Sequence, residues 1–180
     1  MMRQICKQML TNILSRHIVF ACAIAFALAV PGFSATSSFN ELIVTDPLSG
    51  VANGGYDPVS YFTDAEPLSG RPEFEYDWSG VPWHFASPAN RDIFKRSPEI
   101  YAPQFGGHGT MGLARGYLSD GNPRIFVVLG NRLFLFYSTG NRAAFLLSQR
   151  SAYIKAEENW AFLSRDLSTS TSLDLNLAPK

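Results

Sequence analysis

The chain has 180 residues, of which 46% are hydrophobic, 13% aromatic and 17% charged, and its 15 basic and 15 acidic residues give a formal net charge of zero. This length predicts one ordinary domain with room for a tail, and it excludes a two-domain enzyme of the dehydrogenase type. The balanced charge gives no indication of nucleic acid or of an anionic membrane surface as a partner.

Residues 1–35 have the three parts of a secretory signal peptide: a basic start, an apolar core and small residues at the end. The apolar core at residues 18–30 rises only about 20 Å as a helix, whereas the hydrocarbon core of a bilayer is about 30 Å thick. This favours a cleaved signal over an uncleaved membrane anchor. We therefore expect a periplasmic or secreted protein without a stable membrane span after signal cleavage.

Cleavage of this signal changes the inventory of reactive side chains. Cys6 and Cys22 both leave with it, and the mature chain carries three surplus negative charges. The remaining histidines are His84 and His108, and the remaining methionine is Met111. Disulfides, thiolate metal sites and cysteine nucleophiles are therefore excluded from the mature protein.

The mature chain divides into three parts. Residues 36–52 form a polar leader with at most one short strand at 41–45, and residues 53–165 form the folded domain. Residues 166–180 show no apolar periodicity, which predicts a flexible tail.

The first half of the domain predicts a hairpin followed by short helices. Aromatic and acidic residues alternate at 74–78, and a second strand is expected at 81–85 after a Ser-Gly turn. Ser87 as the N-cap, with Pro88 at the first helical position, predicts a helix that continues over 89–96, and a further Ser-Pro pair predicts a one- or two-turn helix at 97–101.

The second half predicts another hairpin and a C-terminal helix. A short helix is expected at 108–115, after a Gly-Gly pair that requires positive φ or close backbone approach. The apolar runs at 124–129 and 132–137 are joined by Gly130-Asn131, a composition typical of type I′ or II′ turns.

The final helix is expected at about 141–163. Its expected buried stripe consists of Ala143, Leu146, Leu147, Ile154 and Trp160, with Tyr153 and Phe162 as flanking members. The whole pattern predicts an α+β fold: one small domain of two β-hairpins packed with short helices and a C-terminal helix.

Two stretches resemble a known family. They are Gly55-Tyr-Asp-Pro-Val-Ser-Tyr-Phe62 and Tyr76-Asp-Trp-Ser-Gly-Val-Pro-Trp-His-Phe-Ala-Ser-Pro-Ala-Asn-Arg91, and the likeness continues to about residue 162. They are similar to the YHS-domain family in its exported bacterial branch. The resemblance implies a small α+β unit of hairpins and short helices.

The resemblance also implies metal handling, notably of copper, through cysteines that this chain lacks. The matching positions are Ser60 in Asp57-Pro-Val-Ser60 and Ala86 in Phe85-Ala-Ser87. A further cysteine of the exported branch, after the Gly-Gly pair, is also missing. Metal binding by cysteine is therefore not carried over.

A residual copper site is one alternative function. His108 and Met111 are three residues apart, and imidazole with thioether suits copper. His84 would have to supply a third ligand from the hairpin. The competing interpretation makes His108 a polar loop residue, Met111 a core residue and His84 a partly exposed strand residue.

A small hydrolase built from Ser60, His84 and Asp57 is a further alternative, although no Gly-x-Ser-x-Gly elbow supports it. Asp57 has a simpler role as the cap of the turn that it begins.

The favoured function is an exported YHS-like binding or accessory module without catalytic chemistry, and its partner is an unidentified small ligand or protein. The candidate ligand-binding residues are aromatic or polar side chains near the two motifs: Tyr56, Asp57, Trp83, His84 and His108.

Overall fold

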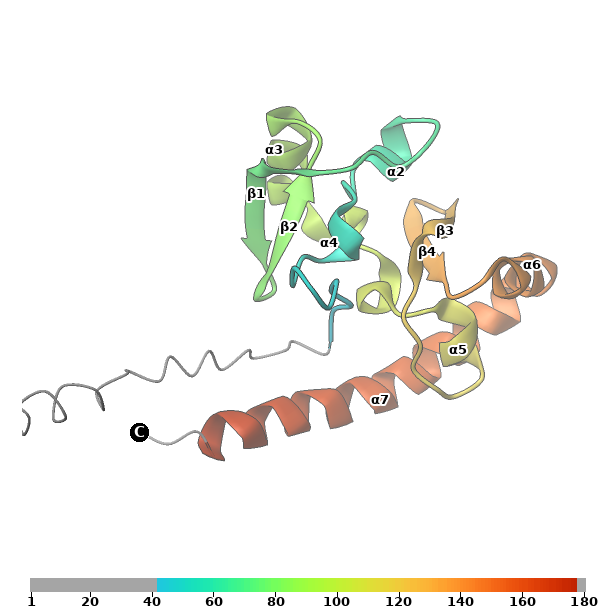
Figure 1. The fold of residues 1–180 in the computed structure, drawn as a ribbon. Helices are drawn as coiled ribbons and strands as arrows, with labels where there is room; N and C mark the ends of the chain where they lie inside the picture. Colours follow the sequence, from blue (N-terminus) through green and yellow to red (C-terminus); the bar gives the residue numbers. More distant parts are fainter. Residues whose placement is uncertain (1–41, 178–180) are drawn as a thin grey trace, which may run out of the picture. The chain divides into compact units, whose positions relative to one another are not determined.

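The computed structural model describes residues 42–177, with side chains up to residue 167. The expected signal peptide and the start of the leader lie outside these residues. The described part of the chain contains two separate antiparallel hairpins, β1–β2 and β3–β4, with helices around them and a C-terminal helix (Figure 1). The predicted α+β class is confirmed.

The first hairpin pairs β1 (Arg71–Trp78) with β2 (Val81–Phe85) through a turn in which Ser79 and Gly80 both have positive φ. Alternate side chains of β2 are buried, because one face of the strand packs on the core. β1 begins three residues before the predicted start, because Arg71 still pairs with β2 beyond an irregularity in the register.

The helix α3 (Pro88–Arg96) begins where the sequence predicts. The Ser87 hydroxyl accepts a hydrogen bond from the Asn90 amide at 3.1 Å, as an N-cap should. The Phe94 ring lies 5.2 Å from Trp83 and 5.1 Å from Phe85, which places α3 against β2. The short helix α4 (Pro98–Tyr101) follows, also as predicted.

The segment before the first hairpin has little regular structure. It contains the 3₁₀ turn η1 (Asn53–Gly55) and the one-turn helix α2 (Ser60–Thr63). At most one short strand is expected in the leader, at 41–45; its described residues 42–45 form none, and an isolated bridge joins Thr45 to Ala52. The Val44 amide instead donates to the carbonyl of Gly106, so the segment is held by a loop and not by a sheet.

The 3₁₀ segment η2 (Gln104–Gly107) shows why a Gly-Gly pair is needed. Gly106 and Gly107 have φ of +62° and +89°, and a Cβ on Gly106 would lie 1.8 Å from the carbonyl oxygen of Leu42. The expected positive φ and close approach are both confirmed. The helix after it, α5 (Thr110–Ala114), is shorter than predicted, because His108 forms a bridge with Asp120.

The second hairpin pairs β3 (Asn122–Leu129) with β4 (Arg132–Phe136). Gly130 and Asn131 have φ of +58° and +56°, which is the type I′ turn. Four consecutive residues of β4, Leu133 to Phe136, are buried, so both faces of this strand are covered.

The predicted C-terminal helix is two helices, α6 (Thr139–Leu147) and α7 (Gln149–Leu177), with non-helical backbone at Ser148. The expected buried stripe is wrong at four positions, because Ala143, Leu146, Leu147 and Ile154 are exposed. The residues buried in its place are Phe145, Ala152 and Ala156.

Two further expectations for these helices have mixed outcomes. Trp160 and Tyr153 pack against the core as expected, whereas Phe162 is 65% exposed. Where the sequence indicated a tail without regular structure from residue 166, the backbone is helical to Leu177. No helix in residues 42–177 combines the length and the apolar character needed to cross a membrane.

Candidate functional site

Asp57 is fully buried and binds backbone and side-chain donors on three segments. One carboxyl oxygen accepts from the Val59 amide at 2.9 Å, which confirms the predicted turn cap. The other accepts from the Ala86 amide at 2.8 Å and from the Asn90 side chain at 2.7 Å. These bonds make Asp57 a structural tie between the turn, the end of β2 and α3, and leave it no access to a ligand.

Ser60 and Ala86, the two positions where the resemblance noted above would place cysteines, both bond to Asp57. The Ser60 hydroxyl donates to the Asp57 carbonyl at 2.7 Å and accepts from the Leu68 amide at 2.9 Å. Ala86 supplies only its amide and a methyl group. A hydroxyl with both roles occupied and a methyl group do not fit a copper ion, so no metal chemistry is assigned to this place.

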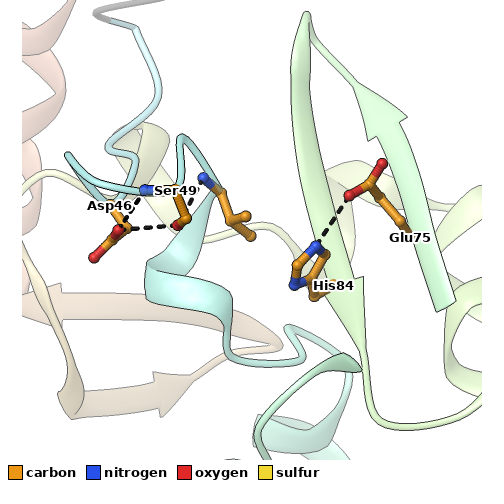
Figure 2. Close-up of polar contacts among 5 residues, drawn as sticks. Asp46, Ser49, Glu75 and His84 are labelled. Atoms are coloured by element: carbon orange, nitrogen blue, oxygen red, sulfur yellow. Dashed lines mark hydrogen bonds and ion pairs between the residues drawn. The ribbon is translucent and has the colours of Figure 1, made fainter. Parts of the chain in front are cut away.

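His84 faces away from the core, on the side of β2 opposite Trp83 and Phe85, as the alternation predicts. Its Nε2 lies 3.0 Å from the carboxylate of Glu75, its partner across the strand pair (Figure 2). His84 and Ser60 therefore have different partners, and the Ser60–His84–Asp57 arrangement of a hydrolase is not assembled.

His108 and Met111 lie in the core beside α7. They are 6% and 8% exposed, and the His108 ring lies 5.3 Å from the Trp160 ring. Met111 belongs to the same apolar cluster, which confirms the core interpretation for this residue. Among the residues that the structure describes, no group of three or more histidine, cysteine, aspartate and glutamate side chains could hold a metal ion.

The two aromatic candidates have structural neighbours. Trp83 is 1% exposed and its indole N–H donates to the carbonyl of Trp78 at 3.1 Å. Tyr56 is half-buried beneath Arg124, whose guanidinium carbon lies 5.9 Å from the ring centre. The five candidates therefore do not gather around one cavity.

A small cavity of about 190 Å³ is bordered by Trp83, by residues 44–47 and by Asn53. Asn53 is 4% exposed, and its amide oxygen has no hydrogen-bond partner in the described part of the chain. Asp46, also at this edge, accepts bonds from the amide and hydroxyl of Ser49 (Figure 2), and these bonds hold the pKa of Asp46 below its usual value. The carboxylate is thus engaged in its own turn.

A larger cavity of about 340 Å³ lies between the tip of the second hairpin and the α6–α7 junction. We call it the hairpin–helix cavity. Its lining consists of Leu129, Gly130, Arg132, Phe134, Phe145, Gln149, Arg150 and Tyr153. None of these residues was among the ligand-binding candidates that the sequence suggested.

One chain of hydrogen bonds orders the edge of the hairpin–helix cavity. The Arg132 guanidinium donates to the Tyr153 hydroxyl, which in turn donates to the Glu157 carboxylate. The guanidinium carbon also lies 5.2 Å from the centre of the Tyr153 ring. Burial and the hydrogen bond to Glu157 raise the pKa of Tyr153 further above neutral pH, where a tyrosine phenol is already a donor.

A comparison with family models, curated protein sequences and solved structures finds no match to this chain. The chemistry of the hairpin–helix cavity follows from its own residues: aromatic walls, two guanidinium groups and a protonated phenol. This composition suits binding, because it combines apolar area with a few orienting polar groups.

Proposed function

We propose that this chain is an exported YHS-like accessory protein that binds a small organic ligand in the hairpin–helix cavity and has no catalytic chemistry of its own. The observation that carries the proposal is the cavity itself. Its volume of about 340 Å³ lies within the usual range for ligand sites, and its walls are aromatic. Export is supported by the signal-like sequence of residues 1–35.

Binding is favoured over hydrolysis by the partners of the side chains that a hydrolase would use. Ser60 is bonded to the Asp57 carbonyl and the Leu68 amide, and His84 is paired with Glu75. Copper handling has no more support, since Met111 belongs to a core cluster, the His108 ring packs beside Trp160, and His84 is paired with Glu75.

The test is a ligand screen by NMR on the purified protein, with small planar aromatic compounds as probes. Binding in the hairpin–helix cavity predicts shifts in the amide resonances of Gly130 and Gln149. Gln149→Phe would fill the cavity and should abolish these shifts. Ala161→Phe places the same side chain at an exposed position of α7 and should preserve them. Shifts that survive in Gln149→Phe, or no shifts with any probe, would overturn the proposal.

A further inference from the structure

The hairpin–helix cavity lies in a basic part of an otherwise acidic mature chain. Residues 121–156 contain five basic residues and no acidic one, although the sequence holds 15 acidic residues in total. The five are Arg124, Arg132, Arg142, Arg150 and Lys155. All the lining residues of the cavity fall within this segment, so its field favours an anionic ligand.

The two arginines at the cavity have different surroundings. Arg132 donates a hydrogen bond to the Tyr153 hydroxyl, which donates to the Glu157 carboxylate. The negative charge of Glu157 therefore partly offsets the positive charge of Arg132. Arg150 is exposed, and no carboxylate in the described residues lies within ion-pair distance of it. Two guanidinium groups and one carboxylate leave one positive charge to be neutralised. A ligand with a single negative charge would match it.

The walls of the cavity indicate the body of the ligand. The half-buried Tyr153 ring is the aromatic surface that a ligand can reach, and it packs edge-on to Phe134 at 5.7 Å. Phe134 and Phe145, which are 3% and 0% exposed, line the buried end of the cavity. Leu129 completes an apolar surface beside them. Flat apolar groups gain most from such walls, since aromatic rings prefer stacked or edge-to-face neighbours.

We infer that the ligand of the hairpin–helix cavity is a small aromatic monocarboxylate, bound by Arg150 at its carboxylate and by the aromatic walls at its ring. Arg132, held by Tyr153, provides a second donor with a set orientation. Guanidinium is the side chain best suited to carboxylates, because its donors match both oxygens. The inference rests on the proposed function and adds the class of ligand.

The experiment compares 2-naphthoate with its neutral counterpart 2-naphthamide by isothermal titration calorimetry. We expect the wild-type protein to bind the carboxylate at least about tenfold more tightly, as one charge-assisted hydrogen-bond pair provides. Arg150→Gln should remove that difference while it leaves the affinity for the amide unchanged. Arg142→Gln, in the same basic segment but outside the cavity lining, should lower carboxylate affinity less than about threefold through the general field alone.

The outcomes separate the inference from the proposed function. Equal affinities for the two compounds, with no effect of Arg150→Gln, would overturn the carboxylate assignment and leave the cavity as a binding site. Equal losses in Arg150→Gln and Arg142→Gln would also overturn it, because the general field would then account for the preference. No binding of either compound would overturn both. Arg150 is exposed, so circular dichroism of the variant should show an unchanged fold.

Discussion

The carboxyl group of Asp57 accepts hydrogen bonds from donors that are two, 29 and 33 residues away in the sequence. The nearest of these donors, the Val59 amide, is the local turn bond that a sequence pattern can predict. The other two bonds join the turn to the first hairpin and to α3. Asp57 therefore sets the relative position of three segments of the domain.

Replacement of Asp57 by alanine should lower the free energy of unfolding by about 3 kcal/mol or more, because it leaves buried donors without an acceptor. Urea denaturation measures the loss. Asp77→Ala, at an exposed position of β1, should change the free energy of unfolding by less than about 0.5 kcal/mol. A stable Asp57→Ala protein that no longer binds its ligand would contradict the structural role and make Asp57 a ligand-binding residue.

At the scale of elements, α6 and α7 show a competition between two sets of residues at helical spacing. One set contains Leu147 and Ile154, and the other contains Phe145, Ala152 and Ala156. The larger side chains of the first set favour it in the sequence, yet the structure buries the second. The small alanines allow α7 to approach α5 closely, where the Asn159 side chain donates to the Leu113 carbonyl at 2.7 Å.

This competition gives a paired prediction. Phe145→Ala should lower the free energy of unfolding by about 3–5 kcal/mol, because Phe145 is fully buried against Phe134 and Phe136. Leu147→Ala should change it by less than about 0.5 kcal/mol, since Leu147 is 90% exposed. Chemical denaturation of the two variants decides. A large loss of unfolding free energy in Leu147→Ala would instead mean that Leu147 is buried, as the sequence pattern predicts.

The elements that could be predicted depend on local signals. The Gly130-Asn131 turn and the Ser87 cap each act within a few residues, so their sequence is sufficient to place them. The segment at 42–45 depends on a partner elsewhere in the fold, because the Val44 amide donates to the carbonyl of Gly106. The hairpin–helix cavity was missed for the same reason, because its walls meet only through tertiary packing. The run without acidic residues at 121–156 is a signal that could have pointed to it.

At the scale of the whole described domain, β4 connects the two halves. Phe134 and Phe136 on one face of the strand pack against Phe145. Leu133 and Leu135 on the other face pack with Tyr61, whose hydroxyl also donates to the Pro123 carbonyl at 2.8 Å. A strand buried on both faces makes the packing of the first segment depend on the second hairpin.

We therefore expect the two hairpins to unfold together in one transition. In a Trp160→Phe background, the remaining tryptophans, Trp78 and Trp83, report on the first hairpin, and far-UV circular dichroism reports mainly on the helices. The two signals should change at the same urea concentration. Leu133→Ala should lower the free energy of unfolding by about 2–5 kcal/mol, because Leu133 is fully buried between the halves. Both urea midpoints should then fall together.

Leu129→Ala, at the 41% exposed tip of the same hairpin, is the matched control and should shift the common midpoint much less. If the tryptophan signal persisted after the helical signal had gone, the first hairpin would be stable without β4. The hydrogen bond from Tyr61 and the packing of Leu133 would then be contacts between two independent units. A single transition whose midpoint falls for both signals in Leu133→Ala would instead show that β4 couples the unfolding of the two hairpins. One face of this strand contacts the first half of the domain, and its other face contacts the second half.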